Sequence, residues 1–135
     1  GIPIAGFHTD VFPAFYLRSA DPPIPVDARF DSPADLAGFI GHELARTARG
    51  IVVANPIPVA DEIRRSDWDA WIAQASSEAT AASVSGRDLT PFVLGRLHAI
   101  SSGQTLKANI ALIKFNTAVA AQLAVELARG VPART

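Results

Sequence analysis

An α/β fold is predicted for this chain of 135 residues by the alternation of two kinds of segment. Residues 50–55, Gly-Ile-Val-Val-Ala-Asn, are a short and nearly continuous apolar run rich in β-branched side chains, which is typical of a strand covered on both faces. The segments before and after this run place apolar residues at the spacing of amphipathic helices. Strands that alternate with helices favour an α/β architecture.

Two further short strands are expected near the N-terminus. Ile2–Phe7 is an apolar run, and Phe15–Arg18 is a second run rich in aromatic residues. The stretch Ser19–Asp27 contains three prolines, which remove backbone donors and favour an extended surface loop. We therefore predict a connection inside one domain here rather than a linker between two.

Three helices are marked by their first residues. Ser32-Pro33 combines a capping serine with a proline in the first turn, and Thr90-Pro91 repeats that combination. Ser66 begins a Ser-Asp-Trp-Asp sequence that is similar to a capping box. A long final helix is expected to run from Thr105 to Leu127.

Two amides interrupt the apolar sequence of that final helix. At about 100° per residue, Asn109 and Asn116 lie within roughly 20° of each other on the helix surface, with Thr105 one turn before Asn109. An amide buried without a partner costs about 1–3 kcal/mol, so such a polar seam needs hydrogen-bonding neighbours or a ligand. The alternative is that both amides cap neighbouring loops.

Asn55 ends the predicted buried strand and is followed at once by Pro56-Ile57-Pro58. In open α/β sheets, ligands bind outside the carboxyl ends of the strands, and two prolines hold the amide there with little entropy left to lose. Asn55 is therefore a candidate site residue, although asparagine also closes turns through its own backbone. Thr9 follows the first strand in the same way, and for it we favour the role of a loop cap.

Composition limits the classes of partner. The net charge of −1 provides no basic surface for a nucleic acid polymer, and the absence of cysteine excludes disulfides and thiolate metal sites. No run reaches about 18 consecutive apolar residues, so no membrane partner is expected. The three histidines are far apart and show no metal-ligand spacing, and no phosphate loop or nucleophile elbow occurs.

Three segments together resemble one family, the pseudouridine-5′-phosphate glycosidases, also called the indigoidine synthase A-like proteins. The order and spacing of its motifs hold over nearly the whole chain. The matching positions are Gly6, Phe7, Thr9, Pro13-Ala14-Phe15, Arg18, Val52 to Pro58, Gly86, Thr90 to Phe92, Leu94, Leu106, Asn109-Ile110, Leu112 and Asn116.

The resemblance implies a three-layer α/β/α fold with a mixed, largely parallel sheet, of which this chain supplies roughly the second half. Residues 1–135 would be the C-terminal half of a single α/β glycosidase domain. The family's acidic glutamate, its lysines and its metal-binding aspartate belong to the first half, so we expect no catalytic residue and no metal ligand here. The chain contains no methionine, and we expect it to be a piece of a longer enzyme whose N-terminal half is its partner.

The resemblance also implies a reaction. Family members reversibly cleave the carbon–carbon glycosidic bond of pseudouridine 5′-phosphate, a small phosphorylated nucleoside, to uracil and ribose 5-phosphate. They use a divalent metal, expected to be manganese and bound by the missing N-terminal half, and related enzymes are homotrimers. For this chain the cytoplasm is the expected location, because cysteine is absent and the N-terminus lacks a basic segment followed by an apolar core. By carry-over Asn109 contacts the base and Asn116 extends the same pocket, so that Asn109, Asn116 and Asn55 are the expected substrate-binding residues.

Departures from the family pattern keep two alternatives open. The family has paired asparagines where this chain has Phe115-Asn116, a glycine-rich run at residues 46–50, and an acid at the position of Val59. An added aromatic residue beside the seam could favour a larger and flatter acceptor, as in a C-glycosynthase that joins ribose 5-phosphate to an aromatic natural product. Because no acid, nucleophile or metal ligand can be named, a noncatalytic remnant or regulatory module is the other alternative.

Overall fold

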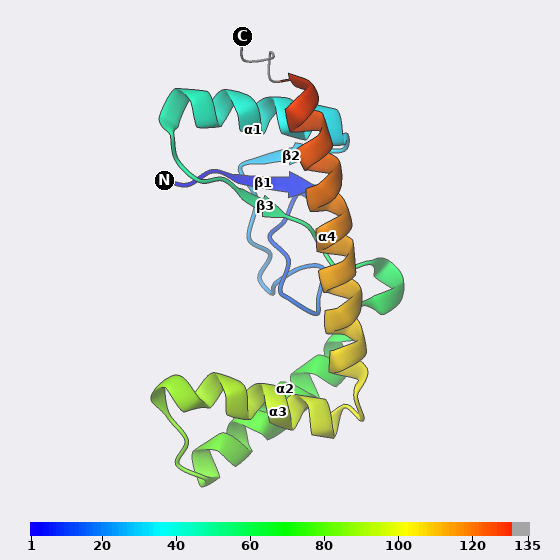
Figure 1. The fold of residues 1–135 in the computed structure, drawn as a ribbon. Coiled ribbons are helices and arrows are strands. Elements are labelled where there is room, and N and C mark those ends of the chain that lie inside the picture. The colour runs from blue at the N-terminus through cyan, green and yellow to red at the C-terminus, as the bar shows by residue number, and fades with distance from the viewer. Residues whose placement is uncertain (131–135) are drawn as a thin grey trace.

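The computed structural model describes residues 1–130, and it confirms an α/β chain with three short strands and four α-helices (Figure 1). Residues 131–135 of the expected domain lie outside the described residues. The elements are β1 (Ile4–Phe7), β2 (Ala28–Phe30), α1 (Pro33–Thr47), β3 (Val52–Ala54), the 3₁₀ turn η1 (Val59–Asp61), α2 (Arg65–Ala81), the 3₁₀ turn η2 (Gly86–Asp88), α3 (Leu89–Ile100) and α4 (Gln104–Gly130).

The three strands form one sheet in the order β2-β1-β3. Both pairings are parallel, and Ala5 of β1 lies opposite Ala28 on one side and Val53 on the other. The expected mixed sheet is thus a wholly parallel one within residues 1–130. Strand β3 is an edge strand here and its Val52 is exposed, so the expectation that this strand is covered on both faces is wrong for the described residues.

Helices α1 and α4 cover one face of the sheet and build its core. Ala5 and Phe7 point from β1 toward these helices, because alternate residues of a strand face the same side. They pack against Leu36, Ala37 and Ile40 of α1 and against Val119 and Leu123 of α4.

A second cluster lies further along α4, toward its N-terminus. It centres on Ile57, which is fully buried, and it includes Tyr16, Ile63, Ala108 and Leu112. The α2–α3 hairpin stands at this end of α4, whereas α1 stands at the other end (Figure 1). Among residues 1–130, α2 and α3 therefore do not form the second helical layer that a three-layer sandwich requires.

The predicted strand at Phe15–Arg18 is wrong. Ala14 and Leu17 exchange backbone hydrogen bonds of 2.9 and 3.2 Å across a tight turn, and Phe15 adopts a positive φ of 59°. Strand β2, which the sequence did not indicate, is instead paired with β1. It has three residues, too few to show a period of two.

The helix starts agree with the sequence to different degrees. Ser32 caps α1 as predicted, since its hydroxyl accepts from the Asp35 amide at 3.4 Å. Helix α2 begins at Arg65 without a side-chain cap, so the expected capping box at Ser66 is not formed. Thr90-Pro91 lies inside the first turn of α3 rather than at its cap.

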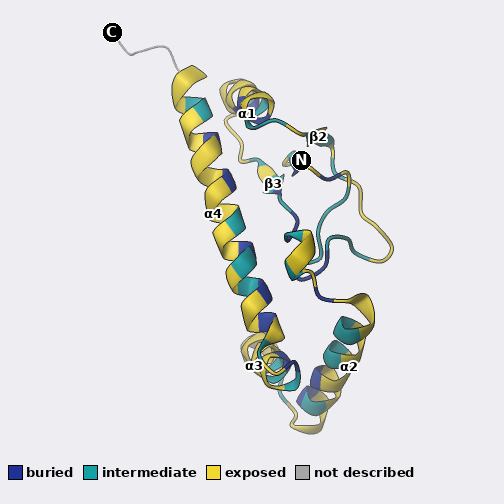
Figure 2. Ribbon diagram, turned by 90° about the vertical axis from the view of Figure 1, so that its right-hand side faces the viewer, coloured by how far each residue is buried: buried dark blue, intermediate teal, exposed yellow. Residues whose placement is uncertain are grey.

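Helix α4 is long and apolar enough, by length and composition, to cross a membrane. The core helix of a globular protein passes the same test, and α4 packs one face against the sheet and α1. Figure 2 shows that its buried residues face the rest of the chain and that its outer side is exposed.

Candidate functional site

The candidate site lies at the carboxyl edge of the sheet, where Asn55 directly follows β3. The loop that holds Asn55 is fixed from both directions. Its two prolines restrict the backbone, and the Arg18 guanidinium donates to the carbonyl oxygen of Ile57 at 2.6 Å. The buried Ile57 side chain anchors the same loop in the second apolar cluster, so the Asn55 amide is presented on a rigid support.

Asn55 and Asn116 are joined by a hydrogen bond. Nδ2 of Asn55 donates to Oδ1 of Asn116 at 2.9 Å, which ties the end of β3 to α4 across 61 residues of sequence. Oδ1 of Asn55 is buried and has no hydrogen-bond partner among the described residues. Exchanging the positions of oxygen and nitrogen in this amide would leave the nitrogen unpaired instead, so one buried polar atom of Asn55 has no protein partner in either orientation.

A cavity of about 470 Å³ opens beside the two amides. Its walls are mainly apolar, and the polar side chains on it are those of Asn55 and Asn116. An apolar hollow with a few fixed polar groups is typical of a small-molecule site. The lining residues come from the turn after β1, from β3 and from α4: Phe12, Pro13, Ala14, Phe15, Val52, Val53, Ala54, Asn55, Leu112 and Asn116.

Asn109 is half-buried and lies nearly two turns before Asn116 on the same side of α4. It does not line this cavity. The structure thus brings together two of the three predicted substrate-binding residues, Asn55 and Asn116, and leaves the role of Asn109 a prediction.

The turn after β1 forms one wall of the site and is held by Thr9. The Thr9 hydroxyl donates to the carbonyl of Val11 at 2.8 Å and accepts from the Val11 amide at 3.2 Å, which confirms its role as a loop cap. A side chain at Gly6 would place its Cβ 2.1 Å from the Thr9 carbonyl oxygen. Glycine is therefore required for the chain to fold back at this point.

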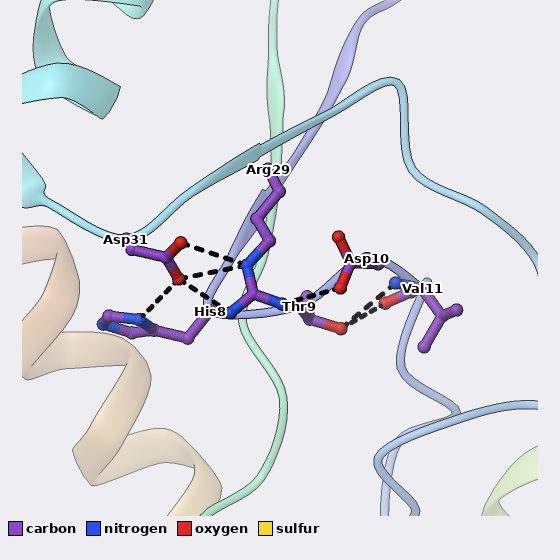
Figure 3. A network of polar contacts seen from close by, with 6 residues as sticks. All are labelled: His8, Thr9, Asp10, Val11, Arg29 and Asp31. Atoms are coloured by element: carbon purple, nitrogen blue, oxygen red, sulfur yellow. Dashed lines mark hydrogen bonds and ion pairs between the residues drawn. The ribbon is translucent and has the colours of Figure 1, made fainter.

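A polar network occupies the same edge of the sheet, after β1 and β2 (Figure 3). Arg29 donates to Asp31 at 2.9–3.1 Å and to Asp10 at 2.6 Å, and Nδ1 of His8 lies 3.1 Å from Asp31. The hydrogen bonds from Arg29 hold the pKa of Asp31 below its usual value. Since two carboxylates already neutralise Arg29, this group is a structural tie between loops rather than a phosphate-binding cation.

This network could not be read from the sequence, because His8 and Asp31 are 23 residues apart. The only available signal was that each of them follows a short strand. That signal appears only once β2 is known to pair in parallel with β1.

The described residues do not offer a site for the expected manganese. No group of three or more histidine, aspartate or glutamate side chains in residues 1–130 is placed to hold a metal ion. Lys107 and Lys114 are exposed on α4.

Comparisons with known proteins agree on one family. The family model described as "Indigoidine synthase A like protein" matches residues 1–126. The chain is 45% identical over 128 residues to the pseudouridine-5′-phosphate glycosidase of Methylobacterium nodulans, a match that covers 94% of this chain and 37% of that protein. The enzyme of the same name from Geobacillus kaustophilus is 43% identical, with coverages of 94% and 42%. The chain thus spans about two-fifths of the length of these curated relatives.

Two solved structures share the fold. The prealnumycin C-glycosynthase AlnA, solved in complex with ribulose 5-phosphate, superposes with a TM-score of 0.83 at 26% identity. An indigoidine synthase A-like protein from Thermotoga maritima superposes with a TM-score of 0.76 at 30% identity. Each match covers 93% of this chain and 41% of the solved one.

Proposed function

Because this chain belongs to the indigoidine synthase A-like family, we propose that it supplies the base-binding wall of a pseudouridine-5′-phosphate glycosidase. The substrate would be a small phosphorylated C-nucleoside, and the products would be uracil and ribose 5-phosphate. Relatives named for this activity at 43% and 45% identity support the proposal. The expected homotrimer and the cytoplasmic location stay predictions.

The observation that carries the proposal is the carboxamide pair on an apolar cavity. The edge of a uracil ring presents both N–H donors and carbonyl acceptors, and a carboxamide can pair with both kinds. Both residues line the cavity, and the hydrogen bond from Asn55 to Asn116 fixes the direction of the two amides. The apolar walls suit the faces of a planar ring.

The remaining groups of the reaction would come from the part of the enzyme that this chain does not match. The leaving atom in a C-glycoside is a carbon, so protonating a glycosidic oxygen, the usual route of glycosidases, is not available. An acid, an imine-forming lysine and a manganese site are expected on the other part. The residues described here would bind and orient the base.

Two assays of uracil release from pseudouridine 5′-phosphate test the proposal. The isolated chain should be inactive, whereas the chain joined to the unmatched part of the Methylobacterium nodulans relative should be active. In the joined protein, Asn116→Ala should lower kcat/KM by roughly 10-fold or more, because it removes the fixed partner of Asn55. Asn109→Ala in the same protein tests the residue carried over from the family.

The matched control is Gln122→Ala, an exposed amide on the same helix outside the cavity. This variant should leave kcat/KM unchanged. Full activity of Asn116→Ala and Asn109→Ala would refute base binding by α4. Activity of the isolated chain would refute the proposal that the reactive groups lie on the unmatched part of the enzyme.

A second candidate is favoured by one observation, the superposition on the C-glycosynthase AlnA. Such an enzyme would form a C–C bond between ribose 5-phosphate and an aromatic acceptor. Phe12 and Phe15 on the cavity wall could stack on an acceptor of this kind. Incubating the joined protein with ribose 5-phosphate and either uracil or a polycyclic phenol separates the two candidates by the product formed.

A further inference from the structure

Helix α4 carries a second apolar stripe that the fold of residues 1–130 does not use. Its members recur with alternating steps of four and three residues, which is the heptad spacing of a helix that packs along another helix. All of them are exposed, and they are Leu106, Ile110, Ile113, Thr117, Ala120 and Ala124. We refer to these six residues as the outer stripe.

The outer stripe is distinct from the face that packs on the sheet. The buried residues of α4, such as Leu112 and Val119, lie roughly 135° around the helix from the centre of the stripe. The large side chains of the stripe are half exposed: Leu106 at 50%, Ile110 at 45% and Ile113 at 58%. In the most apolar 18-residue window of α4, only 17% of the residues are buried. Figure 2 shows this outer side of α4 open to solvent along its length.

The flanks of the outer stripe indicate the charge of a partner. Lys107 and Lys114 lie seven residues apart along one side, and Asn109 and Asn116 lie seven apart along the other. Residues at these flanking positions of paired helices select the partner. Antiparallel pairing of two copies of α4 would bring lysines opposite lysines, and parallel pairing would give the lysines only amides to face. A partner helix with acidic flanking residues would instead pair with both lysines.

We propose that the outer stripe is the docking surface for an amphipathic helix with acidic flanking residues, supplied by the part of the family fold outside the match. The inference rests on the proposed function, because it takes the rest of the enzyme to be present. Both solved relatives hold more than half of their length outside the matched part, which is ample to provide such a helix. The C-terminal half of the outer stripe carries the small residues Ala120 and Ala124, so it can accept bulky side chains of the partner helix. The N-terminal half carries Ile110 and Ile113, which require smaller side chains opposite them.

The docked helix would border the candidate site. Asn116 lies on the flank of the outer stripe and also lines the cavity, so a helix on this stripe passes beside the carboxamide pair. The surface would thereby position the part of the enzyme that supplies the reactive groups next to the base-binding wall.

The test compares substitutions in two proteins, the isolated chain and the chain joined to the unmatched part of the Methylobacterium nodulans relative. Ile110→Glu places a charge in the centre of the stripe. Gln122→Glu is the matched control, since Gln122 is exposed and lies about 160° around α4 from the centre of the outer stripe, away from both of its flanks. Thermal unfolding of each variant is measured by circular dichroism, and the mass of each protein is measured by light scattering.

We expect Ile110→Glu and Gln122→Glu to change the Tm of the isolated chain by similar, small amounts, because both side chains are exposed. In the joined protein, Ile110→Glu should lower Tm by roughly 5 °C or more beyond the control, because the charge would be buried without a partner. Lys114→Glu in the joined protein should also lower Tm, and high salt should reduce that effect.

Equal effects of Ile110→Glu and Gln122→Glu in the joined protein would overturn the proposal. So would an isolated chain that is a dimer and becomes a monomer on Ile110→Glu substitution, because a second copy would then cover the stripe. These readouts require no turnover. A joined protein that shows the predicted Tm difference but releases no uracil would refute the proposed function and leave the docking surface intact.

Discussion

Removing either member of the Asn55–Asn116 pair should have unequal costs for stability. Asn116→Ala removes a hydrogen bond of 2.9 Å and leaves both polar atoms of the Asn55 amide without a protein partner. The lost bond contributes about 1 kcal/mol and an unsatisfied buried group costs about 1–3 kcal/mol, so we expect a loss of about 2 kcal/mol. Asn55→Ala loses the same bond but also removes the buried oxygen that has no partner, and it leaves only the exposed Asn116 to hydrate. Its expected cost is about 1 kcal/mol or less.

The assay is urea unfolding of the isolated chain, followed by circular dichroism, for both single variants and the double variant. The double variant should be about as stable as Asn55→Ala alone, because the side chain of Asn116 stabilises the fold through its hydrogen bond to Asn55. The resulting cycle gives a coupling energy equal to the cost of Asn116→Ala, about 2 kcal/mol. Equal costs for the two single variants, or additive costs in the double variant, would refute the reasoning that Asn55 holds a buried polar atom without a partner.

Three further outcomes follow from the core, the turn after β1 and the polar network, and each is measured as a change in unfolding free energy. Leu36→Ala should cost about 2–5 kcal/mol because Leu36 is fully buried between α1 and the sheet, while Leu44→Ala at an exposed position of the same helix should cost well under half of that. Gly6→Ala should abolish the cooperative transition, since its Cβ would lie 2.1 Å from a backbone carbonyl oxygen; Gly38→Ala, with open space around it inside α1, should stabilise by up to about 1 kcal/mol. The pKa of Asp31 is lower in the folded chain than in the unfolded chain. The ionised Asp31 therefore stabilises the fold at pH values above its unfolded pKa, and this stabilisation is lost as the pH falls through its folded pKa. Asp31→Asn should therefore reduce the loss of stability below about pH 4, and an unchanged acid profile would contradict the role of Arg29.

The sequence predicted those parts of the fold that depend on local patterns. The apolar run before Asn55, the cap at Ser32 and the long helix after Gly103 each have a local physical cause, and each is present in the structure. Strand β2 and the turn at Phe15 were missed or misassigned because they depend on pairing and packing with distant residues.

For the candidate site, too, the sequence predicted the residues that stand out locally but not the contacts between distant residues. Asn55 stood out because a polar residue ends an apolar run, and Asn116 because it interrupts an apolar helix. That the two amides bind each other, while Asn109 does not line the cavity, depends on where α4 crosses the sheet. Helical periodicity gives the angle of a residue around its axis but not the neighbour that it meets.

The position of the carboxamide pair between the two apolar clusters has a mechanical consequence. Leu112 belongs to the cluster around Ile57 and Val119 to the cluster on the sheet, so Asn116 lies where α4 passes from one to the other. Any bend of α4 at this crossing would change the distance from Asn116 to Asn55 before it disturbed either cluster. The Asn55–Asn116 hydrogen bond is thus sensitive to bending of α4. Isotope-edited spectroscopy of these two side-chain amides should show such bending as a change in their signals, while the signals of the rest of the chain stay unchanged.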